Sequence, residues 1–169
     1  MKTDRLWVYQ LVTRWLPETR FFGLKAALLR WCGAKIGSNV RISSSARFLG
    51  GGELVVGDDV WIGTDDIIHP VYGASVKIGN CCDIGPGVMI LTGSHKIDAH
   101  GAHIAGEGTA ADVEIGNGCW LGARSLVLPG VHISEKILVA AGSIVTNSVG
   151  VASVLVAGIP ASIKKDLHT

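Results

Sequence analysis

The chain has 169 residues, enough for one hydrophobic core, and because 48% of them are apolar it is not a disordered protein. Fifteen Lys and Arg against 14 Asp and Glu leave a net charge of +1. The sequence has no strongly basic balance and no P-loop glycine motif, so neither nucleic-acid binding nor nucleotide hydrolysis is indicated. No apolar run approaches the ~20 residues of a membrane-spanning helix, and the polar start MKTDRLWVYQ is unlike a signal peptide.

Residues 1–33 are predicted to form two helices that make an N-terminal cap. Apolar residues recur at helical spacing on both sides of Pro17, which separates the two helices, and Gly33 is typical of a helix C-terminal cap. Seven Lys or Arg against two acidic residues give residues 1–35 a net charge of +5, and three tryptophans lie among them. Basic helices with tryptophans suit an anionic membrane surface, so residues 2–16 have two candidate roles: covering the first coil and peripheral membrane association.

Residues 34–150 repeat in steps of six. An apolar residue opens each step, and a small or apolar residue stands four places later. A period of six fits neither a strand nor a helix, but it fits a short flat strand followed by a corner, and three of these close a triangular coil. Such hexapeptide repeats are typical of a parallel β-helix, so the predicted fold class is all-β. The openers are Ile36, Ile42, Phe48, Val56, Ile62, Ile78, Ile84, Ile90, Ile115, Leu121, Val127, Ile133, Val139 and Val145; the plus-four residues are Val40, Ala46, Val60, Cys82, Val88, Cys119, Ser125, Val131, Ile137 and Ser143.

The six-residue phase breaks at three places. Two breaks are short, at residues 50–52 and 68–71, and the third is long, at residues 96–108. This third stretch, KIDAHGAHIAGEG, is predicted to be a loop extruded from the coil, and long loops in compact repeats are usually functional or disordered. Residues 151–169 are predicted to form a C-terminal tail.

The four cysteines favour a reducing, cytoplasmic setting. They are Cys32, Cys81, Cys82 and Cys119, and no CxxC spacing occurs among them. Cys82 and Cys119 occupy plus-four positions, so we expect both thiols to be buried in the coil.

Three phrases carry a resemblance to a known family. They are TGSHKID at residues 92–98, CWLGARSLVLPGV at residues 119–131, and the ending AAGSIVTNSV…VAGIPASIKK. Over residues 17–167 the chain resembles the hexapeptide-repeat acyltransferases, in particular the sugar O-acetyltransferases, which include galactoside and maltose acetyltransferases and enzymes acting on O-antigen, capsule or colanic acid. The resemblance implies a left-handed β-helix, a homotrimer with active sites between subunits, and acetyl-CoA as donor.

His95 is the predicted catalytic base. An alcohol attacks a thioester well only if its proton is removed, and a neutral imidazole suits that role at physiological pH. His95 ends a hexad beside the long loop, at the position that matches the family's catalytic histidine. Either Asp98 or a backbone carbonyl is expected to orient its ring, and the sequence does not decide between them.

The resemblance also suggests binding residues. Asp65 matches a position that binds the acceptor sugar, and Trp120 matches one where an aromatic ring can lie beside the sugar or the pantetheine. A solvated corner at Asp65 and a packed Trp120 explain these residues equally well. The residues that match the acetyl-CoA site are Ala123, Ala141, Thr146, Asn147, Ser162, Lys164 and Lys165. Relatives often carry a basic residue at positions 147 and 162, so the expected phosphate clamp is weakened here. A solvated basic tail is the alternative reading of the two lysines.

The predicted function is acetyl transfer from acetyl-CoA to a sugar hydroxyl, without a metal. The acceptor would be a sugar or a lipid-linked oligosaccharide precursor of a surface polysaccharide, at the cytoplasmic face of the inner membrane. Three alternatives remain open: an N-acetyltransferase acting on an amino sugar, a non-catalytic β-helix scaffold, and a zinc hydratase like the γ-type carbonic anhydrases. The last would use His69, His95 and His100 meeting at a subunit boundary, but His100 falls in the flexible loop.

Overall fold

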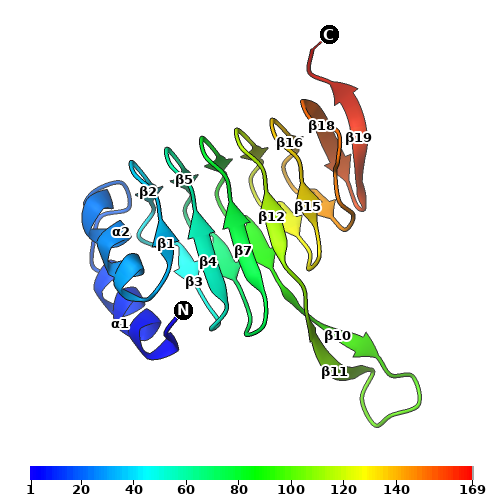
Figure 1. Ribbon diagram of the computed structural model, residues 1–169, viewed down its shortest axis with the longest axis horizontal. Helices are drawn as coiled ribbons and strands as arrows, with labels where there is room; N and C mark the ends of the chain where they lie inside the picture. The colour runs from blue at the N-terminus through cyan, green and yellow to red at the C-terminus, as the bar shows by residue number, and fades with distance from the viewer. Residues whose placement is uncertain (169) are drawn as a thin grey trace.

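A computed structural model describes residues 1–168. Most of the chain winds as a parallel β-helix with three sheets (Figure 1). Each coil contributes one short strand to each sheet in turn, and we name the sheets faces A, B and C. Face A contains β1 (Lys35–Ile36), β4 (Glu53–Val56), β7 (Ser75–Ile78), β12 (Val113–Ile115) and β15 (His132–Ile133). Face B contains β2 (Arg41–Ile42), β5 (Trp61–Ile62), β8 (Asp83–Ile84), β13 (Trp120–Leu121), β16 (Leu138–Val139), β18 (Val154–Gly158) and the antiparallel β19 (Ala161–Asp166). Face C contains β3 (Arg47–Phe48), β6 (Ile67–His69), β9 (Met89–Leu91), β14 (Leu126–Val127) and β17 (Ile144–Val145).

The hexad prediction is confirmed in detail. All of the predicted openers and plus-four residues are buried. Openers from successive coils stand in register; on face B, for example, Ile62 pairs with Ile84, and Ile84 pairs with Leu121. The buried column therefore forms because each apolar side chain packs against its equivalents in the coils before and after it.

The three breaks in the repeat lie at one edge of the prism. Each follows a strand of face C, namely β3, β6 or β9, and precedes a strand of face A. The second break starts later than the sequence suggested, because Ile68 is a further buried opener that pairs with Phe48 of β3. All three departures from the coil thus gather along the edge between faces C and A.

The long break is an ordered hairpin rather than an irregular loop. It consists of β10 (Gly93–Ile97) and β11 (Ala105–Ala110), which pair antiparallel and project away from the coil (Figure 1). At its base the Ala111 amide donates to the Thr92 carbonyl over 2.9 Å, which closes the hairpin where it leaves the coil. An exposed ion pair of 2.5 Å joins Lys96 to Glu107 across the two strands.

Two helices cover the first coil, as predicted (Figure 1). They are α1 (Thr3–Thr13) and α2 (Phe22–Trp31), and their buried residues include Leu6, Tyr9, Ala26 and Leu29. Gly33 ends α2 with a φ of 95°, and the amides of residues 33 and 34 bond back to the carbonyls of residues 30 and 29, which is a Schellman cap. No helix within residues 1–168 has both the length and the hydropathy needed to cross a bilayer.

Candidate active site

His95 lies in an open groove at the edge where the breaks gather. The groove has a volume of about 520 Å³ and runs between the base of the hairpin and the second break. His95 contributes from β10, His69 from the end of β6, and Tyr72 from the short second break. Apolar walls with a few polar groups are typical of small-molecule binding sites.

A backbone carbonyl, not Asp98, holds the His95 ring. Nδ1 of His95 lies 2.9 Å from the carbonyl oxygen of Gly106 on the facing strand. Because a carbonyl only accepts, Nδ1 must carry the proton, and in the neutral ring Nε2 is then an acceptor. Asp98 is occupied elsewhere, since its carboxylate accepts from the amides of His100 and Gly101 at the hairpin tip. The contact fixes the tautomer that a general base requires.

Tyr72 is a groove residue that the sequence analysis did not single out. Its side chain is exposed, and its ring lies against Gly51 of the first break, where an added methyl group would come within 2.2 Å of the ring. The glycine is therefore needed for the ring to lie where it does. The signal available in the sequence was that Gly51 falls in the first break of the repeat phase and that Tyr72 directly follows the second.

Asp65 and Asp66 share a corner but have opposite environments. Asp65 is exposed at the edge between faces B and C, with a φ of 58°. Asp66 is fully buried, and its two oxygens accept from the amides of Gly63 at 2.7 Å and Val88 at 2.8 Å. Burial raises the pKa of Asp66 to about 7, against the lowering effect of those hydrogen bonds. Asp66 stands four places after the opener Ile62, so the hexad phase could have marked it as an inward residue.

Trp120 is more than half exposed on the outside of face B, so it is not packed between coils. Its neighbours in adjacent coils are Asp83 and Leu138. It also lines a second hollow of about 450 Å³ together with Lys136 and Leu167 near the C-terminal hairpin. Trp120 and Asp65 therefore lie away from the His95 edge within one chain.

The residues predicted for acetyl-CoA lie in three places. Ala123 and Ala141 occupy successive corners between faces B and C; Ala123 is half-buried and Ala141 is exposed. The coils approach closely there, because a methyl group added at Gly122 would lie 2.5 Å from the Ala141 amide nitrogen. Ser162, Lys164 and Lys165 are exposed on β19, which closes the C-terminal end of face B. Thr146 and Asn147 are exposed after β17, on the same edge as the hairpin. One chain does not bring these three groups together with His95.

The described part of the chain, residues 1–168, contains no group of three or more His, Cys, Asp and Glu side chains placed to hold a metal ion. His100 lies exposed in the turn between β10 and β11. A zinc hydratase would therefore lack its three ligands within a single chain.

A family model described as the hexapeptide repeat of succinyl-transferase matches residues 112–147. A curated relative, the putative colanic acid biosynthesis acetyltransferase WcaF of Escherichia coli (strain K12), is 32% identical over 96 residues, which is 56% of this chain and 51% of that protein. The chain thus spans about half the length of the curated relatives that it matches.

Two solved structures share the fold over nearly the whole chain. The hexapeptide-repeat acetyltransferase VCA0836 of Vibrio cholerae, complexed with acetyl coenzyme A, has a TM-score of 0.81 and 25% identity, and the match covers 98% of this chain and 86% of that one. A galactoside acetyltransferase in complex with coenzyme A has a TM-score of 0.71 and 19% identity, covering 98% and 80%. The resemblance found in the sequence is thereby confirmed: the chain carries hexapeptide repeats, and the relatives and structural neighbours that it matches include acetyltransferases.

Proposed function

We propose that the protein is an acetyl-CoA-dependent O-acetyltransferase that acts on a sugar hydroxyl, with His95 as general base. The acceptor would be a surface-polysaccharide precursor at the cytoplasmic face of the inner membrane. The observation that carries the proposal is the contact between His95 Nδ1 and the Gly106 carbonyl, because it leaves Nε2 as the proton acceptor beside the groove. The named activity of WcaF and the acetyl coenzyme A in the VCA0836 complex support the reaction class.

The reaction needs little more than positioning and one proton acceptor. Nε2 of His95 takes the proton of the sugar hydroxyl while the hydroxyl oxygen attacks the carbonyl carbon of the thioester. The carbon–sulfur bond of the thioester then breaks. The proton returns from the imidazolium to the leaving thiolate, so the ring is neutral again at the end. Acetyl-CoA supplies the activated acetyl group when it is bound. For its pantetheine arm and phosphates we propose Ala123, Ala141, Thr146, Asn147, Ser162, Lys164 and Lys165.

The separation of these residues within one chain leads us to propose a homotrimer. His95 projects on a hairpin, whereas Asp65, Trp120 and the two alanines lie on other parts of the prism, so a neighbouring chain is needed to assemble a complete site. We expect light scattering at micromolar concentration to give three times the mass of one chain. A monomer with full transferase activity would contradict this proposal.

The decisive assay is transfer of labelled acetyl from acetyl-CoA to a panel of sugars, amino sugars and lipid-linked oligosaccharides, with mass spectrometry of the products. An ester product supports the proposed O-acetylation, whereas an amide product identifies the amino-sugar alternative. A non-catalytic scaffold would give no product, and CoA would not raise its melting temperature in a thermal-shift titration.

We also propose that the helical cap touches the membrane. The outer side of α1 exposes Trp7 and Leu11, and Trp15, in the turn that follows the helix, continues this four-residue spacing and is 82% exposed. The same segment carries Arg14 next to Trp15, and Arg5, whose guanidinium lies over the Trp31 ring of α2 at 4.7 Å from its centre. Aromatic and basic side chains together favour an anionic lipid surface.

Sedimentation with anionic vesicles tests this association. Binding by the native protein should fall as salt rises, and the double variant Arg5→Glu, Arg14→Glu should partition less. Trp15→Ser should also weaken binding without lowering the melting temperature, because the ring is outside the core. The matched comparison is Arg14→Glu with Arg124→Glu, which makes the same charge change at an exposed residue far from the cap and should leave binding nearly unchanged. Equal partitioning of all variants would leave α1 with a covering role alone.

A further inference from the structure

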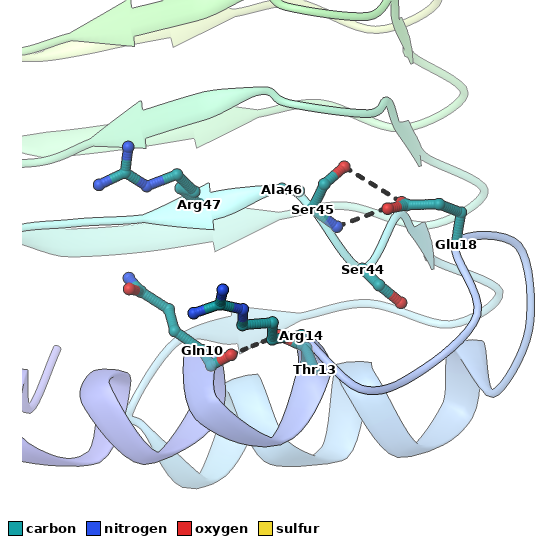
Figure 2. A pocket seen from close by; sticks show the side chains of 8 residues that line it. All are labelled: Gln10, Thr13, Arg14, Glu18, Ser44, Ser45, Ala46 and Arg47. Carbon is teal, nitrogen blue, oxygen red and sulfur yellow. Dashed lines mark hydrogen bonds between the residues drawn. The ribbon is translucent and has the colours of Figure 1, made fainter.

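A third pocket lies between α1 and the first coil, away from the hairpin. It has a volume of about 420 Å³, and Figure 2 shows that its polar side chains come from α1 and the segment after it on one side, and from β3 and the turn before it on the other. Gln10 and Arg14 rise from α1 and its C-terminal end, and Arg47 comes from β3 on the other side. None of these residues belongs to the proposed acetyl-transfer site.

The two arginines of this pocket have no counter-charge. Neither the Arg14 nor the Arg47 guanidinium has an ion-pair or hydrogen-bond partner within residues 1–168. The one acidic lining residue is Glu18, and its carboxylate already accepts from the amide and hydroxyl of Ser45 at 3.2 and 3.1 Å. Glu18 also lies at the opposite side of the pocket from Gln10, Arg14 and Arg47, which extend toward the same side (Figure 2).

The walls of the pocket are held in place by buried contacts. Lys25 is fully buried, and its Nζ donates to the Glu18 carbonyl at 2.8 Å and to the Ser44 hydroxyl at 3.1 Å. The Ser44 hydroxyl donates in turn to the Pro17 carbonyl at 2.9 Å. The Gln10 amide donates to the Phe48 carbonyl at 3.0 Å and thereby ties α1 to β3. The two arginines therefore project from a preorganised frame, which lowers the entropic cost of binding a ligand between them.

We propose that this pocket binds a phosphate group. Two exposed, unpaired guanidiniums line the same hollow, and a phosphate there would neutralise both charges while accepting paired N–H bonds from each planar fork. The phosphate can belong to a soluble phosphate ester or to a lipid, and the adjacent Trp15 and Leu11 of the exposed strip would place a lipid headgroup at the same spot. The site does not depend on the proposed acetyl transfer.

Calorimetric titration with inorganic pyrophosphate tests the soluble source. Arg14→Gln and Arg47→Gln should each weaken binding about tenfold or more, since a hydrogen bond to a charged group contributes about 1.5–3 kcal/mol. Arg20→Gln makes the same charge change at an exposed residue outside the pocket and should alter the affinity less than twofold. Thermal unfolding should confirm that all three variants are folded.

Flotation tests the lipid source, with vesicles containing phosphatidic acid compared against vesicles of equal surface charge made with oleic acid. If the phosphate belongs to a lipid, the Arg47→Gln variant should lose binding to the vesicles with phosphatidic acid and keep its binding to the vesicles with oleic acid. A loss specific to Arg14 and Arg47 in either experiment supports the site. If these variants behave like Arg20→Gln with both pyrophosphate and phosphatidic acid, the proposal is wrong. Because no measurement uses CoA, this result stands apart from the test of acetyl transfer.

Discussion

Replacing His95 with alanine is expected to lower kcat by roughly 10²–10⁴, the usual contribution of a positioned general base. The side chain is exposed on β10, and its one hydrogen bond, to the Gly106 carbonyl, is on the hairpin rather than in the coil. The fold should therefore remain intact. CoA should still bind, because the residues proposed to hold it lie elsewhere. Steady-state kinetics together with a CoA thermal-shift titration would measure both effects.

The matched controls are His100→Ala and His103→Ala, which remove exposed imidazoles from the turn of the same hairpin. Both should keep a kcat within a few-fold of the native value. Near-normal transfer by His95→Ala would overturn the assignment of the base, and His69, which lines the same groove, would be the next residue to replace.

Replacing Asp66 with alanine is expected to give the largest loss of stability among the polar substitutions considered. The change leaves the amides of Gly63 and Val88 buried without their acceptor. Each unsatisfied buried amide costs about 1–3 kcal/mol, so the free energy of unfolding should fall by roughly 2–6 kcal/mol. Urea unfolding at a fixed protein concentration would measure the loss, with Asp83→Ala on the exposed side of face B as control.

The same residue predicts a pH dependence. Burial raises the pKa of Asp66 to about 7 in the folded protein, above the ~3.9 of a solvated aspartate. Between these two values the folded state holds a proton that the unfolded state has lost, so the stabilisation from this group falls as pH rises from about 4 to about 7. The difference in unfolding free energy between the native protein and Asp66→Ala should therefore be larger at pH 5 than at pH 8. An equal difference at both values would show that Asp66 is ionised throughout.

The hexad phase predicted the coil well because every inward residue must stack on its equivalents. This constraint repeats every six residues, so even Cys82 and Cys119, which are buried and in adjacent coils, were assigned correctly. The same rule applied to residue 66 would have identified the buried carboxylate. Ile68 was not recognised as an opener because the six-residue phase is interrupted directly after it, although it pairs with the opener Phe48.

The candidate site was less predictable because its residues lie where the repeat rule does not apply. The ring of His95 is fixed by a carbonyl eleven residues away, through an antiparallel pairing that no six-residue pattern encodes. The positions of Tyr72 and His69 beside it depend on three breaks gathering at one edge. The pocket at Arg14 and Arg47 joins a helix to a strand 33 positions later, and the sequence analysis did not bring them together.

The closed base of the hairpin makes this part of the chain exchangeable. Thr92 and Ala111 bond to each other, so the segment between them enters and leaves the coil at nearly one point. A shorter or longer insert joined at those two residues would leave the register of faces A, B and C unchanged. Chimeras that replace this one contiguous segment should therefore fold with the coil unchanged, which makes residues 93–110 a practical unit for protein engineering.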